Sequence, residues 1–134
     1  DFLVDFFVAN DGMPDQLWQN NGDGTFTDVA LVAGCAVDLC GRSKAGMGMD
    51  ARDLDDDGDL DLLVGNLTGE TDSLFYNEGG YFIDRTISAG LAAESQRYTR
   101  FGLGFVDFDH DFIQQIDNIT LDYFGAADFR GQNE

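Results

Sequence analysis

The sequence predicts an all-β fold built from short antiparallel strands. Its 17 Gly, single Pro and 12 Phe are typical of many short strands joined by tight glycine turns. Apolar residues make up 43% of the chain, more than a disordered acidic tail would contain. The length of 134 residues is that of one domain, or of a piece of one. We therefore expect a folded β domain.

Each expected strand is a short apolar or alternating run bounded by turn residues. In chain order the expected strands are Val4–Ala9, Leu17–Gln19, Thr25–Val29, Gly48–Ala51, Asp61–Asn66, Ser73–Tyr76, Tyr81–Arg85 and Gly102–Val106. Residues 31–37 and 86–95 are expected to form single helical turns, because neither stretch is long enough for a stable helix.

A repeat of about 56 residues runs through the chain. The segment Asp5–Asn10 (DFFVAN) matches Asp61–Asn66 (DLLVGN), 56 residues later. The other matches, in the same order, are Asn20–Asp28 with Asn77–Asp84 (one residue deleted), Leu31–Gly34 with Ile87–Gly90, and Met47–Asp57 with Phe101–Asp111. Because four anchors recur in one order, the repeat predicts the architecture.

About four antiparallel strands in each repeat predict the blades of a β-propeller. We expect a single partial propeller domain over residues 1–134, with repeats at about 5–60 and 61–116 and a divergent tail at 112–134. A closed propeller needs roughly 4 to 8 blades, so about two four-stranded blades leave the ring incomplete in one chain. Missing blades of a longer protein, or further copies of this chain, would complete it.

The acidic segment Asp53–Asp61 (DLDDDGDLD) has the pattern D-x-D-x-D-G-x-x-D, in which Gly58 permits a turn with positive φ. The expected metal ligands are the side chains of Asp53, Asp55 and Asp57, the backbone carbonyl of Asp59 and the carboxylate of Asp61. Such an all-oxygen, flexible shell suits Ca²⁺ better than Zn²⁺ or Mg²⁺. The segment therefore predicts a calcium site.

Two other interpretations of this segment are weaker. A solvated acidic turn would explain neither the spacing nor the glycine. An EF-hand needs a Glu at loop position 12, which falls on Val64, and flanking helices where this sequence predicts strands.

A second acidic loop keeps Asp107, Asp109 and Asp111, but Phe112 stands where the glycine should be. Asp117 can take the last ligand position only if the loop has two extra residues, so a second calcium site and its absence both stay open. At the N-terminus, Asp1 and Asp5 correspond to the last ligands of a third loop.

On these residues the sequence resembles the FG-GAP/VCBS repeats of bacterial proteins and integrin α-subunits, and especially the ASPIC/UnbV subgroup related to cartilage acidic protein. The segments that carry the resemblance are 5–30, 41–80 and 100–111. The resemblance implies a β-propeller of several blades, Ca²⁺ in the acidic loops and an extracellular, cell-surface or periplasmic location. It also implies ligand binding or adhesion rather than catalysis.

Charge and composition limit the kinds of molecule that the chain can bind. A formal net charge of −19 opposes binding to nucleic acid, and neither a membrane span nor a signal peptide is visible in this segment. Cys35 and Cys40 are close enough for a local disulfide, but two free thiols are equally compatible with the sequence.

The function that we predict is a noncatalytic calcium-binding module that contacts an extracellular protein or glycan ligand. One alternative is a self-assembling subunit that builds a propeller from several chains as a homo-oligomer. Another is a metal-dependent hydrolase, but the sequence has a single His, His110, and no nucleophile elbow. We therefore do not expect an enzyme.

Overall fold

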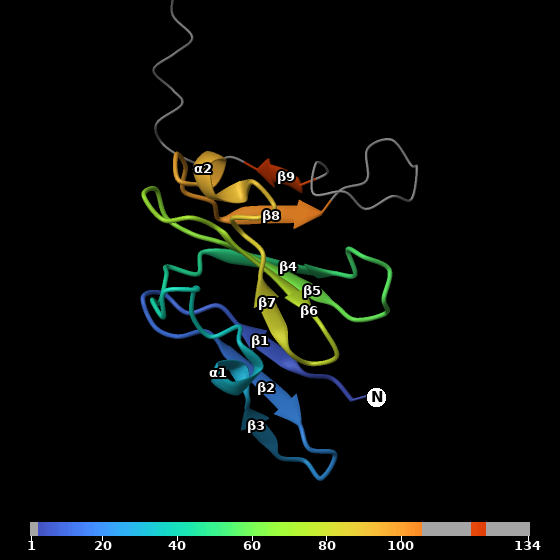
Figure 1. Cartoon of the computed structure of the whole chain (residues 1–134). Helices are drawn as coiled ribbons and strands as arrows, with labels where there is room; N and C mark the ends of the chain where they lie inside the picture. Colours follow the sequence, from blue (N-terminus) through green and yellow to red (C-terminus); the bar gives the residue numbers. More distant parts are fainter. Residues whose placement is uncertain (1–2, 106–118, 123–134) are drawn as a thin grey trace, which may run out of the picture.

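The computed structural model of the chain describes residues 3–105, together with the backbone of residues 119–122. The described part is mostly β structure, in antiparallel sheets of three, four and two strands that follow one another along the chain (Figure 1). The strands are β1 (Phe6–Val8), β2 (Gln16–Asn20), β3 (Phe26–Asp28), β4 (Gly48–Arg52), β5 (Asp61–Gly65), β6 (Ser73–Asn77), β7 (Phe82–Asp84), β8 (Gly102–Phe105) and β9 (Ile119–Asp122).

All eight expected strands are present, with ends that differ by a few residues. The two helical segments are single turns, α1 (Ala30–Ala33) and α2 (Leu91–Ser95), and α1 ends at Gly34 in a left-handed conformation. Among the described residues no helix is both long enough and apolar enough to span a membrane.

The strand count differs from the expected two four-stranded sheets. Only the β4-β5-β6-β7 sheet has four strands, whereas the β1-β2-β3 sheet has three in the described part of the chain. By the 56-residue repeat β1 is the counterpart of β5, so the first sheet matches the last three strands of the second. In the same way β8 matches β4, and it pairs with β9 as β4 pairs with β5.

Two apolar layers hold the sheets together. In the first layer Leu62, Val64 and Phe75 of the four-stranded sheet pack against α1 and against Phe7 and Leu17 of the three-stranded sheet. The second layer, on the other face of the four-stranded sheet, consists of Leu54, Leu63, Leu74 and the partly buried residues around them, which include Leu103 and Phe105 of β8. Because successive strand residues face opposite sides, the continuous apolar run of β5 is buried on both faces.

Each of the first two sheets contains the same turn, held by an Asp and an Asn. The backbone amide of Asn10 donates a hydrogen bond to Asp15 Oδ1 at 2.9 Å, and the backbone amide of Asn66 donates one to Asp72 Oδ1 at 3.1 Å. The two turns differ in their ion pairing. In the second turn Arg100 Nη1 lies 2.8 Å from Asp72 Oδ2, whereas no ion pair of Asp15 is found among the described residues. In the first repeat the position of Arg100 is Gly46, where a Cβ would come within 2.8 Å of the Asn10 carbonyl oxygen.

Burial raises the pKa of Asp15 to about 6, although the Asn10 amide and the charge of Lys44 lower it. A carboxyl group with a raised pKa keeps its proton in the folded state after the unfolded chain has lost it. Its contribution to stability is therefore greatest below the unfolded pKa of 3.8 and falls as the pH rises toward 6.

We expect Asp15→Asn to remove this pH dependence, because Asn keeps the acceptor for the Asn10 amide and carries no charge. The difference in the free energy of unfolding, variant minus unchanged protein, should rise by on the order of 1 kcal/mol from pH 4 to pH 7. This figure allows for solvent screening at a half-buried site. Urea unfolding at both pH values measures the difference. If the difference is the same at pH 4 and pH 7, Asp15 does not titrate in this range.

The open question of the disulfide has a clear structural outcome. Cys35 is buried and Cys40 is exposed, and both are free thiols. Burial raises the pKa of Cys35 to about 12, so this thiol stays protonated and unreactive at neutral pH.

Candidate metal centre

The acidic loop joins β4 to β5, the two strands whose ends pair Arg52 with Asp61. The loop turns tightly at two residues with positive φ, Asp56 at 65° and Gly58 at 95°. The left-handed conformation carries no steric penalty at Gly58, and Asp is among the few other residues that tolerate it. The glycine of the sequence pattern therefore occupies the kind of turn that was predicted for it.

The backbone of the loop folds around the side chain of Asp53. Its Oδ1 accepts hydrogen bonds from the amides of Asp56 at 2.8 Å and Asp57 at 3.2 Å, and its Oδ2 accepts one from Gly58 at 2.9 Å. Three donors on one carboxylate fix both its position and that of the loop.

Asp61 closes the loop from the start of β5 and is fully buried. Its Oδ2 accepts a hydrogen bond from the backbone amide of Leu54, and its Oδ1 accepts one from the backbone amide of Asn77, both at 2.8 Å. These bonds connect the loop to the end of β6, so the neighbouring strand positions the carboxylate.

Asp53, Asp55 and Asp61 each offer a carboxylate oxygen, and these oxygens lie within 4.8 Å of one another. We call these residues the aspartate triad. Loss of hydration, followed by the charges of Asp57 and Asp53, raises the pKa of Asp55. Burial also raises the pKa of Asp61, against the two amides that it accepts. In both groups desolvation is the larger cause, and the neighbouring carboxylates add a smaller repulsion, from Asp57 and Asp53 on Asp55 and from Asp55 and Asp57 on Asp61.

The side chains of the other two predicted ligand residues make hydrogen bonds of their own, which leave the predicted backbone carbonyl of Asp59 untested. The carboxylate of Asp57 lies outside the triad, and its Oδ1 accepts the Asp59 amide at 2.9 Å. Asp59 Oδ2 accepts the Gly79 amide at 2.9 Å, so this side chain connects the loop to the turn between β6 and β7. Asp107, Asp109, Asp111 and Asp117 lie outside the described residues, as does Asp1.

The donor chemistry of the triad fits a hard cation. All three groups are carboxylates, the type of ligand that Ca²⁺ and Mg²⁺ take. Three ion pairs are found in the described part of the chain, Arg42–Asp38, Arg85–Glu78 and Arg100–Asp72, and none includes a loop residue. The triad can therefore hold a metal ion, which would neutralise its charge.

The first sheet repeats the anchor of Asp61. Asp5 Oδ1 accepts the Asn20 amide at 2.8 Å, the same distance as Asp61 Oδ1 to Asn77 in the second sheet. Asp5 therefore occupies the position that the repeat predicts for it, directly before β1.

Sequence reasoning missed the residues that hold the loop from outside. Asn77 and Gly79 donate their amides to Asp61 and Asp59. Both belong to the segment NEGG, which was recognised only as a repeat anchor and turn. One feature of the sequence could have indicated them, because an Asn recurs at the end of β2 and at the end of β6, at Asn20 and Asn77.

Among the matches to known proteins, the family match covers the part of the chain that includes the acidic loop. Residues 1–64 match the family model of the FG-GAP-like repeat. Cartilage acidic protein 1 of Xenopus tropicalis and of Homo sapiens are each 40% identical to this chain over 65 residues. That match covers 48% of this chain and 9% of each relative, so the chain spans a small part of their length. Over its first 64 residues the chain is therefore similar to an FG-GAP-like repeat.

Proposed function

We propose that the chain is a noncatalytic, calcium-binding module built from β-propeller blades, and that it acts in extracellular interaction or adhesion. The observation that carries the proposal is the convergence of the aspartate triad within 4.8 Å in a loop fixed by backbone amides. The ligand of the module would be an extracellular protein or glycan.

Calcium suits the loop better than magnesium for a physical reason. Ca²⁺ accepts six to eight oxygen ligands in flexible geometry, whereas Mg²⁺ requires a near-ideal octahedron and retains several waters. The triad supplies three carboxylates, and the pKa of Asp61 is raised by burial and, to a smaller extent, by the charges of Asp55 and Asp57. A calcium site of this kind supports an extracellular, cell-surface or periplasmic location, where weak sites can be occupied.

The test compares two substitutions that remove the same charge from adjacent positions. Asp55→Asn removes a triad carboxylate, whereas Asp56→Asn changes a neighbour outside the triad and retains a residue that tolerates positive φ. We expect Asp55→Asn to weaken calcium binding about tenfold or more, and Asp56→Asn to change it by less than about threefold. Isothermal titration calorimetry with CaCl₂ measures both.

Equal weakening by the two variants would contradict the assignment, since it would show that calcium responds only to the total charge of the loop. Titration with MgCl₂ in place of CaCl₂ tests the choice of ion. Tighter binding of Mg²⁺ would overturn that choice.

A second candidate function, self-assembly into a propeller, is favoured by the exposed face of the first sheet. Phe6 and Val8 of β1 are the counterparts of Leu62 and Val64 of β5. The β5 residues are covered by the first sheet and are 5% and 1% exposed, whereas Phe6 is 51% and Val8 38% exposed. We infer that this face packs against another sheet, either in a second copy of the chain or in missing blades of a parent protein.

Light scattering of the purified chain in calcium buffer tests the self-association. We expect a defined oligomer, and we expect Phe6→Glu to return it to the monomer mass, because a charge cannot be buried in an apolar interface without a large penalty. Ile87→Glu, at an exposed residue away from β1, is the control. A monodisperse mass of 14.7 kDa for the unchanged chain would contradict self-assembly.

A further inference from the structure

A groove of about 360 Å³ separates α1 and the loop that follows it from the outermost strand of the four-stranded sheet. Leu31, Val37 and Leu39 line one side, and Phe82, Ile83 and Asp84 of β7 line the other. Gly34 brings the two sides together at one end, since a Cβ there would lie 2.7 Å from the Phe82 carbonyl oxygen. The groove is large enough for a branched or aromatic side chain.

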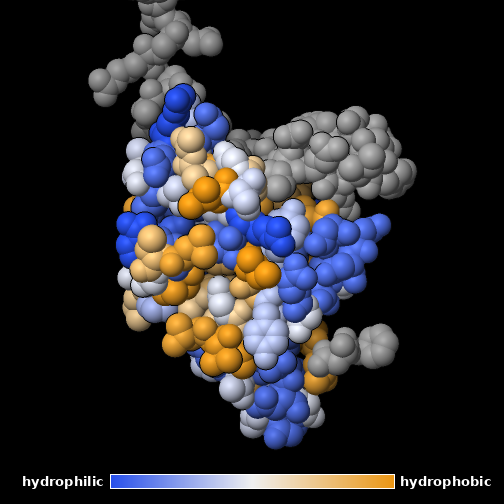
Figure 2. All heavy atoms as spheres, in the orientation of Figure 1, coloured by the Kyte–Doolittle hydropathy of each residue, from blue (hydrophilic) through white to orange (hydrophobic). Residues whose placement is uncertain are grey.

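The surface around the groove is unusually apolar for a chain of net charge −19. Figure 2 shows apolar side chains gathered on the face that carries α1 and β7 in Figure 1. Leu31 and Val32 of α1 are 75% and 80% exposed, and Leu39 and Ile83 are also exposed. Isolated apolar residues on a surface are ordinary, but a cluster around a groove indicates a contact with another molecule.

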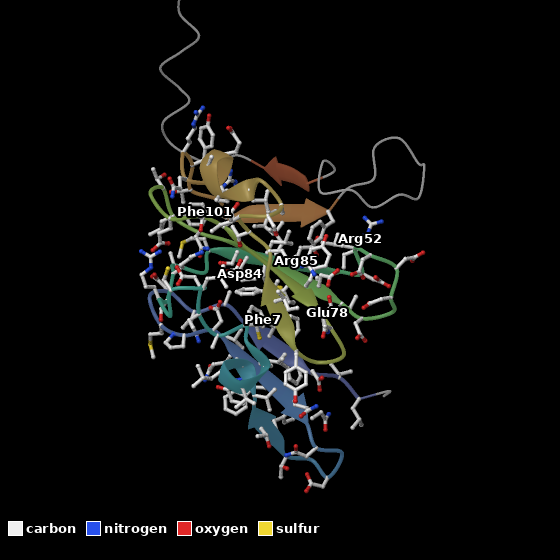
Figure 3. All side chains as sticks on the ribbon, viewed as in Figure 1. Phe7, Arg52, Glu78, Asp84, Arg85 and Phe101 are labelled. Atoms are coloured by element: carbon white, nitrogen blue, oxygen red, sulfur yellow. The ribbon has the colours of Figure 1, made fainter. Side chains whose placement is uncertain are left out.

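The charge at the groove selects the partner. Asp38 is already paired with Arg42 at 3.1 Å. Asp84 on β7 accepts the Thr86 amide at 2.9 Å and takes part in none of the ion pairs found among the described residues. The next residue, Arg85, is paired with Glu78 (Figure 3). The charge of Lys44 acts on both Asp38 and Asp84, but Lys44 forms no ion pair with either among the described residues.

At this groove a second copy of the chain would bring another acidic surface against Asp84, unlike the apolar face of β1, where self-association is proposed. A basic partner gains both from the apolar groove and from the carboxylate beside it. We propose that the groove between α1 and β7 binds a basic peptide segment of another protein, which inserts one apolar side chain and places a Lys or Arg beside Asp84.

This site lies on the β6–β7 side of the four-stranded sheet, and its residues are distinct from those of the aspartate triad. It also differs from the exposed face of β1, where self-association is proposed. Peptide binding at the groove can therefore be tested independently of calcium binding and of self-association.

The probe is a capped peptide of sequence Ser-Lys-Leu-Lys-Ser, titrated into the isotopically labelled chain in calcium buffer and followed by NMR. We expect the amide signals of Val37, Leu39 and Ile83 to shift together. Replacing the leucine of the peptide by alanine should weaken binding on the order of tenfold. Replacing both lysines by glutamate should abolish binding.

Two pairs of protein variants separate the groove from general attraction to an acidic surface. Asp84→Asn keeps the acceptor for the Thr86 amide and should weaken binding about two- to fivefold, whereas Asp23→Asn, in the exposed turn after β2, should leave it unchanged. Leu39→Ser should weaken binding, and Ile87→Ser, also exposed but outside the groove, should not.

Three results would overturn the proposal. One is that the alanine peptide binds as tightly as the leucine peptide. Another is that Asp23→Asn weakens binding as much as Asp84→Asn. The last is that no amide of the groove shifts at saturating peptide.

Discussion

Asp72→Ala is expected to lower the free energy of unfolding by about 3–5 kcal/mol, the largest effect of any single substitution considered for this chain. Asp72 and Arg100 are 1% and 2% exposed at their side chains, and their charged atoms lie 2.8 Å apart. Alanine would leave the Arg100 guanidinium buried without a counter-charge. It would also leave the Asn66 amide without its acceptor.

Apart from Asp72, Arg100 has one hydrogen bond and one aromatic contact, in which its guanidinium lies 6.0 Å from the centre of the Tyr98 ring. Its Nη1 donates to the Ser95 carbonyl at 2.8 Å, but its Nε has no hydrogen-bond partner among the described residues. Burial raises the pKa of Asp72 despite the opposing charge of Arg100, so the ionised carboxylate is held at a cost. The pair is therefore expensive to break, even where its formation adds little stability.

Urea unfolding of the single variants Asp72→Ala and Arg100→Met and of the double variant measures the coupling between the two side chains. We expect the double variant to be less destabilised than the sum of the single variants, because it leaves no unpaired buried charge. If Asp72→Ala lowers the free energy of unfolding by less than about 1 kcal/mol, water reaches the Asp72–Arg100 pair. The pair then does not connect the four-stranded sheet firmly to β8.

The strands could be predicted because each one is an apolar or alternating run bounded by Gly, Asn or Asp. The run at β5 was unambiguous, since a strand buried on both faces is continuously apolar. The strand β9 was missed because its sequence does not repeat any earlier segment, although Ile119 and Thr120 are β-branched residues that favour strands. Sequence periodicity also could not show that the first sheet has three strands, since pairing depends on which strands are adjacent in space.

The candidate metal site could be predicted only in part. Spacing and the glycine located the loop, and three of its five predicted ligand positions form the aspartate triad. The orientation of Asp59 toward Gly79 could not be predicted, because it depends on the position of the neighbouring hairpin. The burial of Asp61 depends on the same packing.

Calcium is expected to stabilise the fold by about 2.7 kcal/mol when its free concentration is a hundredfold above the dissociation constant. The ion would neutralise the aspartate triad, in which burial and, to a smaller extent, the charge of Asp55 raise the pKa of Asp61. For a chain of 134 residues a stabilisation of this size shifts the melting temperature on the order of 10 °C. Asp55→Asn should remove about half of the shift if it weakens binding tenfold, and more if it weakens binding further, whereas Asp56→Asn should retain most of it.

The most direct test is therefore the melting temperature of the unchanged chain in millimolar CaCl₂ and in excess EDTA, at matched ionic strength so that screening is constant. The proposed calcium site predicts a clearly higher midpoint in calcium, and a smaller difference between the two buffers in the Asp55→Asn variant than in the unchanged chain. Equal midpoints in the two buffers would contradict calcium binding by the aspartate triad.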